Sequence, residues 1–158
     1  MDSIRIFGYK SFKKLSVQLH PINLLIGANG AGKSNFLSLF EMLGNIYEKR
    51  LGAYVAQVGG VDKLLYQGRK VTGRIAVNLL IAKSEYDLAL LESDGKLIVE
   101  REVVGCYDDV CPLDLVRKNV ITEFQSESSL KDHKEEDLSN YISQIRKFHF
   151  HDTGRRSP

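Results

Sequence analysis

Eight consecutive residues, from Gly27 to Ser34, have the types and the spacing of a phosphate-binding loop. Their sequence, Gly-Ala-Asn-Gly-Ala-Gly-Lys-Ser, fits the Walker A pattern G-x-x-x-x-G-K-[ST] at every fixed position. Glycines let the backbone turn tightly, so that successive N–H groups face one centre where an anion can bind. Lys33 would add a positive charge beside the β- and γ-phosphates, and the Ser34 hydroxyl would take one coordination position on Mg²⁺. The motif therefore predicts binding of a nucleoside triphosphate together with magnesium.

The residues on either side of the motif are those that this chemistry requires. The apolar run 22–26 (INLLI) precedes the loop and predicts a strand of the parallel type, covered on both faces. Residues 33–47 follow, with apolar side chains at spacings of three and four, and predict a helix whose N-terminus faces the anion. A chance glycine-rich turn is the alternative, and the complete motif between correct flanks disfavours it.

Length and composition are those of one globular domain. The chain has 158 residues, of which 43% are hydrophobic and 27% charged, which argues against wholesale disorder. A formal net charge of +2 neither demands nor excludes nucleic acid as a partner. No stretch reaches the roughly 20 apolar residues of a membrane span, and the first residues lack the layout of a signal peptide. We therefore expect a cytoplasmic protein without a membrane partner.

Two groups of strands are expected outside the loop. Residues 3–7 and 15–19 alternate in hydrophobicity and predict an antiparallel hairpin. Residues 74–81, 86–91 and 96–102 predict a meander, with Asp94-Gly95 as a strong hairpin turn signal. An irregular connection that ends in a short helix over 61–68 is expected between these groups.

The last third of the sequence is less regular. Residues 105–139 lose periodicity and are rich in polar and charged side chains, which indicates a polar surface insertion. Helical spacing returns over 138–147, and residues 148–152 alternate as a strand does.

Two stretches, Gly-Tyr-Lys-Ser-Phe at 8–12 and the segment 22–35, resemble a known family. They are similar to the start of the ABC-type ATPase heads of the SMC, RecF and OLD-nuclease group, and most of all to its bacterial AAA-family ATPases. Residues 58–65 and 148–153 are also similar, so the resemblance touches nearly the whole chain. It implies an α/β fold of the P-loop NTPase class: the N-terminal part of an ABC-type head, with a parallel core strand plus an antiparallel β meander.

The resemblance also implies roles for single residues. Lys10 matches a basic position that approaches the bound nucleotide, with a solvated turn lysine as the alternative. His151 and Asp152 stand nearest the place of a glutamine loop that contacts the metal and the attacking water. They are the catalytic candidates, although no glutamine is present and a surface or core pair is the alternative. The residues expected to hold ATP are Gly27, Asn29, Gly30, Ala31, Gly32, Lys33, Ser34, Asn35 and Lys10, with Ser34 as the Mg²⁺ ligand.

Several parts of such a head are not found in this sequence. Heads of the group carry a signature stretch, an apolar strand ending in Asp-Glu and a switch histidine. We therefore expect residues 1–158 to be a single ATPase domain that is incomplete at its C-terminus. It would hydrolyse ATP to ADP and phosphate when completed by the missing signature and Walker B half. The expected partner is a second ATPase head, in a homodimer or from a split partner.

The sequence is compatible with other partners and with two other functions. DNA and a separate effector or nuclease are possible partners. The chain could instead be a nucleotide-binding module without hydrolysis. It could also be a nucleic-acid-binding protein that grips the backbone through lysines such as Lys10, Lys13 and Lys14, although its basic residues are scattered.

Overall fold

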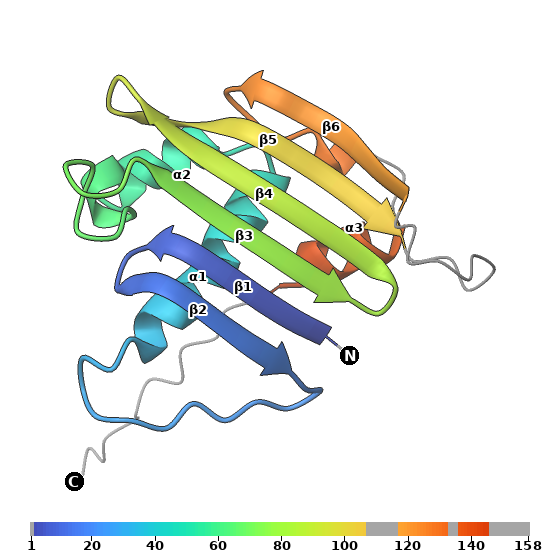
Figure 1. Ribbon diagram of the computed structural model, residues 1–158, viewed down its shortest axis with the longest axis horizontal. Coiled ribbons are helices and arrows are strands. Elements are labelled where there is room, and N and C mark those ends of the chain that lie inside the picture. Colours follow the sequence, from blue (N-terminus) through green and yellow to red (C-terminus); the bar gives the residue numbers. More distant parts are fainter. Residues whose placement is uncertain (1, 107–116, 133–135, 146–158) are drawn as a thin grey trace, which may run out of the picture.

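A six-stranded antiparallel sheet forms the centre of the molecule. The computed structural model describes residues 2–106, 117–132 and 136–145. The strand order is β2-β1-β3-β4-β5-β6, and every neighbouring pair is antiparallel (Figure 1). The strands are β1 (Asp2–Tyr9), β2 (Phe12–Leu19), β3 (Arg74–Ile81), β4 (Ser84–Ser93), β5 (Lys96–Cys106) and β6 (Arg117–Gln125).

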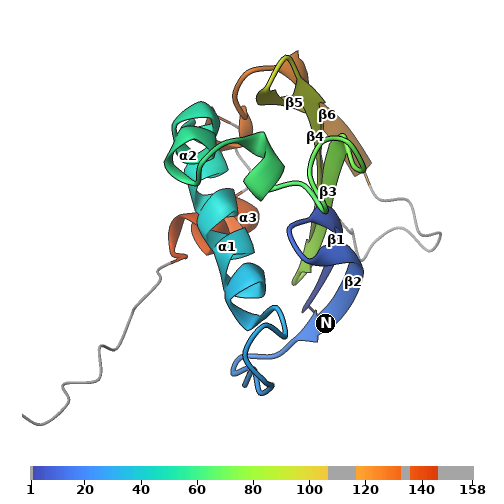
Figure 2. The same cartoon turned by 90° about the vertical axis from the view of Figure 1, so that its left-hand side faces the viewer.

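The helices cover one face of this sheet, and none of the described helices lies on its other face, as Figure 2 shows. They are α1 (Lys33–Tyr47), α2 (Leu51–Gln57) and α3 (Glu136–Ser143), with the short 3₁₀ helices η1 (Val61–Lys63) and η2 (Leu130–Asp132). In the ranges that the structure describes, no helix is long and apolar enough to span a bilayer.

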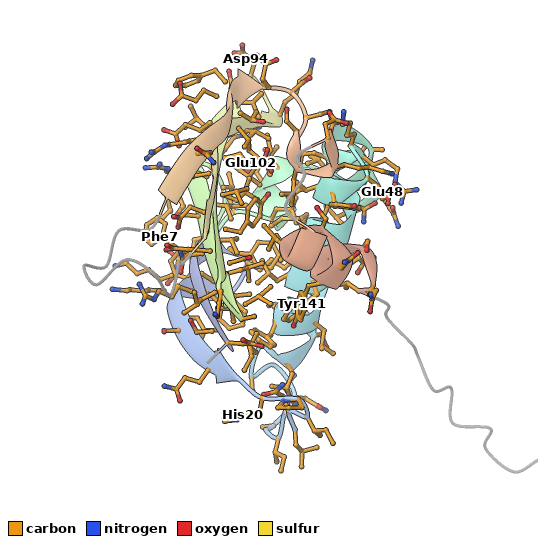
Figure 3. All side chains as sticks on the ribbon, turned by 90° about the vertical axis from the view of Figure 1, so that its right-hand side faces the viewer. Phe7, His20, Glu48, Asp94, Glu102 and Tyr141 are labelled. Atoms are coloured by element: carbon orange, nitrogen blue, oxygen red, sulfur yellow. The ribbon has the colours of Figure 1, made fainter. Side chains whose placement is uncertain are left out.

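The core lies between the covered sheet face and α1. Alternate residues of β1 and β3, such as Ile4, Ile6 and Val77, point to the helices and are buried, because successive side chains of a strand face opposite sides. Leu39 and Met42 of α1 meet them at helical spacing and are fully buried. Figure 3 shows this packing, with Phe7 on the open side of the sheet. The core thereby fixes α1, and with it the loop that precedes α1.

The two predicted groups of strands are confirmed. The hairpin of β1 and β2 pairs from Asp2 with Leu19 up to Tyr9 with Phe12. The turn between β4 and β5 has positive φ at both central residues, 51° at Asp94 and 77° at Gly95, as a type I′ turn requires.

The structure does not confirm the predicted parallel core strand over 22–26. These residues follow β2, and in the described part of the chain they are paired with no strand. Ile22, Leu24 and Ile26 are 90%, 81% and 85% exposed. A strand exists only through hydrogen bonds to a neighbour, and an apolar run cannot by itself reveal whether that neighbour is present. The stretch is therefore an exposed apolar segment.

Regular structure also occurs where the sequence predicted none. β6 lies within the stretch 105–139 that was interpreted as a polar insertion, and it pairs with β5 along the edge of the sheet. The C-terminal end of β6 is exposed and includes an apolar side chain, Phe124, at 66% exposure. Hydrophobicity therefore does not distinguish the buried from the exposed residues of this strand. α2 was missed because Gly52 and the pair Gly59-Gly60 resemble an irregular connection.

A buried carboxylate joins the sheet to the segment after β6. Glu102 of β5 is fully buried and accepts three hydrogen bonds, which satisfy both of its oxygens. Its Oε1 accepts from the Tyr86 hydroxyl at 2.5 Å and from Ser128 Oγ at 2.6 Å, and its Oε2 accepts from the Ser129 N–H at 3.0 Å. Burial, and then the charge of Glu102, raises the pKa of Tyr86 well above its ordinary value, so the phenol stays a donor.

The segment 127–132, which we name the clasp, connects this network to the helices. Glu127 accepts hydrogen bonds from the backbone N–H groups of Leu51 and Gly52 at 2.9 and 3.4 Å, at the start of α2. Two ion pairs, Lys131–Glu48 at 2.6 Å and Lys49–Asp132 at 2.5 Å, hold it to the C-terminal end of α1. The clasp thus attaches one edge of the sheet to the helix that carries the phosphate loop at its other end.

Candidate nucleotide-binding site

The predicted phosphate-loop residues surround one hollow at the N-terminus of α1. Its lining is the six residues Asn29, Gly30, Gly32, Lys33, Ser34 and Asn35. Gly27 and Ala31, which were also predicted, belong to the same loop, but they do not line this hollow. The hollow is therefore a concave surface formed by backbone groups, one amine, one hydroxyl and two side-chain amides.

Two glycines of the loop have conformations that favour glycine. φ is +83° at Gly30 and +93° at Gly32, in the left-handed region that L side chains rarely adopt. A Cβ on Gly30 would meet no atom within 4 Å, so the outer side of the loop is open. A Cβ on Gly32 would lie 3.1 Å from the Phe12 ring, so the loop packs directly on the β1–β2 turn.

The cap and the first turn of α1 contain no side chain that would compete with an anion. Gly32 occupies the capping position without a side-chain hydrogen bond, and the first turn contains no acidic residue. The first N–H groups of a helix lack intrahelical partners and carry a partial positive charge. This end of α1 is therefore suited to bind a phosphate.

The Lys33 amine points back over the loop. Its Nζ donates to the carbonyl oxygens of Gly27 at 2.5 Å and Ala28 at 2.7 Å. An ammonium group has three donors and a strong preference for anionic acceptors, so a phosphate oxygen could replace these carbonyls.

Lys10 lies in the turn between β1 and β2, and it is held against α1. Its Nζ donates to Ser38 Oγ at 2.8 Å, and its backbone N–H donates to the carbonyl of Leu64 at 2.7 Å. The adjacent Ser11 Oγ accepts a hydrogen bond from Asn35 Nδ2 at 2.9 Å. The turn is thus attached to the first part of α1 by two side-chain contacts.

Lys10 also lines a second hollow beside the first. Asn35 lines both, and the second hollow includes the basic residues Lys63, Arg69 and Lys70. Asp62 is the one acidic residue among the described residues that line it, and it pairs with Arg69 at 3.4 Å. The surface next to the phosphate loop is therefore mainly positive.

Sequence reasoning did not identify Ser38 or Tyr9 as part of the site. Ser38 is buried, and its Oγ lies 2.9 Å from the Tyr9 hydroxyl. The one available signal was its position four residues after Ser34, which places both on the same side of the helix. The catalytic candidates His151 and Asp152 lie outside the described residues.

Comparison with protein families identifies the one to which the chain belongs. The family model of the AAA ATPase domain matches residues 1–151. No curated protein and no solved structure matches the chain significantly.

Proposed function

Because the chain belongs to the AAA ATPase domain family, a family of P-loop nucleotide-binding proteins, we propose that it binds ATP and Mg²⁺ at the hollow of its phosphate loop. The observation that carries this proposal is the lining of that hollow, where Lys33, Ser34 and the backbone of Gly30 and Gly32 come together at an uncapped helix N-terminus. The backbone N–H groups and the Lys33 amine can donate hydrogen bonds to phosphate oxygens. The Ser34 hydroxyl oxygen can coordinate the magnesium ion.

Each group at the loop would make a different contact with the nucleotide or its metal ion. The N–H groups of the loop and of the first turn of α1 would hold phosphate oxygens, and Lys33 would exchange its two carbonyl partners for them. Ser34, exposed in the first turn, would hold the metal. When bound, Mg²⁺ draws charge from the phosphates and so makes them easier to attack. Lys10 would contact the nucleotide from the β1–β2 turn.

Hydrolysis is proposed to require parts from outside this hollow. No carboxylate lies among the six described residues that line it, whereas phosphoryl transfer to water needs a group to orient the attacking water. The same observation favours the alternative, a module that binds nucleotide without hydrolysing it. Under the main proposal, a second head supplies the missing groups, in a homodimer or from a separate polypeptide.

The exposed apolar segment 22–26 supports this requirement. It leads directly into the loop, and four of its five side chains are apolar. Backbone groups and apolar side chains exposed in this way are stabilised when another strand pairs with them. We propose that completion of the head covers this segment, as in an ABC-type head of the SMC, RecF and OLD-nuclease group. An effector or nuclease and DNA are further candidate partners of such a head.

Replacing Lys33 by alanine is expected to weaken ATP binding by about thirtyfold to a hundredfold, because the phosphates lose a charge-assisted hydrogen bond. Calorimetric titration of the purified chain with Mg²⁺-ATP measures the change. Lys13→Ala is the matched control, since Lys13 is an exposed lysine of β2 that does not line the hollow.

Equal affinity of the Lys33→Ala variant and the unchanged chain would contradict the proposed site. Phosphate release that rises faster than linearly with protein concentration, and that disappears in Lys33→Ala, would instead indicate that copies of the chain assemble a complete catalytic site.

A further inference from the structure

We propose that Ser38 is a positioning residue, which holds the ammonium group of Lys10 in place for the nucleotide. The inference rests on the nucleotide site proposed above and adds a residue outside the phosphate-loop motif. Ser38 lies in α1 one turn after Ser34 and is 7% exposed. It therefore does not reach the ligand and would act through Lys10.

The hydrogen bonds of the Ser38 hydroxyl fix its orientation. A hydroxyl group has one hydrogen to donate and two lone pairs that accept. Ser38 Oγ donates its hydrogen to the carbonyl of Asn35 at 2.8 Å. Both lone pairs then accept, one from Lys10 Nζ at 2.8 Å and one from the Tyr9 hydroxyl at 2.9 Å. The oxygen is thus aimed at Lys10 by its other two partners.

The partners of Ser38 are themselves held in place. The phenol of Tyr9 is fully buried, and burial raises its pKa far above the ordinary value, so it remains a neutral donor. The Tyr54 hydroxyl donates to the backbone carbonyl of Ser38 at 3.3 Å and joins α2 to the same point. A buried network whose members are all satisfied is rigid, and rigidity is what a positioning residue needs.

The backbone of Lys10 is fixed as well. Its φ of +46° is unusual for a residue with a side chain, and its N–H donates to Leu64. Tyr9 forms an isolated bridge with Leu65. Both ends of the long lysine side chain are therefore set before a ligand arrives. Ordering a lysine on binding costs conformational entropy, and a lysine that is already ordered binds its ligand more tightly.

The position of Lys10 fits a role beside the phosphate loop. Lys10 and Asn35 line one hollow, and Asn35 also lines the hollow of the loop. Asn35 connects the two in another way, since its side chain donates to Ser11 while its carbonyl accepts from Ser38. The same turn of α1 thus contributes to the phosphate hollow and aligns the second lysine.

A double-mutant cycle separates this role from a merely structural one. Mg²⁺-ATP is titrated calorimetrically into the unchanged chain, Ser38→Ala, Lys10→Met and the double variant. Each single change is expected to weaken binding by roughly fivefold to tenfold, and the double variant no further, as for residues in one network. Ser38→Thr, which keeps the hydroxyl, is expected to restore binding. The proposal would be overturned if the loss of ATP affinity in the double variant equalled the product of the two single losses, or if Ser38→Ala lost no affinity.

Two further variants keep the outcome decisive. Tyr9→Phe removes one of the two groups that orient the Ser38 oxygen but leaves its bond to Lys10, so it is expected to weaken ATP binding by less than Ser38→Ala does, and a larger loss than in Ser38→Ala would overturn the proposal. If Ser38→Ala does not fold, Ser38→Cys, with a poorer acceptor of similar size, takes its place in the cycle. Failure of the proposed function is distinguishable, because ATP binding would then be absent, or unaffected by Lys33→Ala, in the unchanged background.

Discussion

Replacing Gly8 by alanine is expected to destabilise the domain by about 3 kcal/mol or more, a large share of the stability of a small protein. Gly8 lies near the end of β1 with a φ of +71°, which costs an L-residue roughly 1–2 kcal/mol. A Cβ there would lie 2.1 Å from the backbone oxygen of Arg74 and 2.9 Å from Thr72 Cγ2. Since the closer atom belongs to the backbone, the first residues of β3 would have to move.

Gly44 provides the matched control for this change. It lies in the interior of α1, and a Cβ there would meet no atom within 4 Å. Gly44→Ala is therefore expected to stabilise the protein by about 0.5–1 kcal/mol, through the higher helix propensity of alanine. Urea denaturation of both variants measures the free energy of unfolding. Destabilisation of similar size at both positions would contradict the steric explanation.

Replacing Glu102 by alanine is expected to cost about 3–5 kcal/mol of stability, because three donors lose their acceptor and the missing side chain leaves a cavity. The change leaves the Tyr86 hydroxyl, Ser128 Oγ and the Ser129 N–H without their acceptor, in a part of the core that excludes water. Unsatisfied buried donors are each costly, and the cavity left by the side chain adds to the loss.

Two comparisons test whether the network is responsible. Glu102→Gln keeps the shape but turns one acceptor into a donor, so it is expected to cost less, about 1–3 kcal/mol. Glu123→Ala removes an exposed glutamate from the neighbouring strand β6, and a change below about 0.5 kcal/mol is expected. Chemical denaturation measures all three variants. A cost for Glu102→Ala no greater than that for Glu123→Ala would show that the buried network contributes nothing.

The antiparallel part of the fold was predictable because its signals are local. Alternation of apolar and polar residues marked β1, β3 and β4, and Asp94-Gly95 marked the turn before β5. The segment 22–26 carried an equally clear apolar signal, but strand formation depends on a neighbour elsewhere in space. β6 is a strand without a clear apolar signal, because an exposed edge strand tolerates polar residues at its ends.

The candidate site also has a part that was predictable from local sequence and a part that was not. The loop from Gly27 to Ser34 is contiguous, so the motif located the hollow, which is lined by five residues of the motif together with Asn35. Ser38 could not be found in this way, since its role exists only after Lys10, 28 positions earlier, is brought against α1. Contacts between distant segments depend on packing, which the spacing of residues along the chain does not record.

The clasp has a consequence for the order in which the protein folds. Its ion pairs join positions 83 residues apart, whereas the β4–β5 hairpin closes through a short local turn. Closing a long loop costs more entropy, so contacts of this separation form after the local ones. Interactions that are absent from the transition state act on the rate of unfolding and leave the rate of folding nearly unchanged. We therefore expect the clasp to form late in folding, so that it has little effect on how fast α1 reaches the sheet but prolongs the time that α1 stays there.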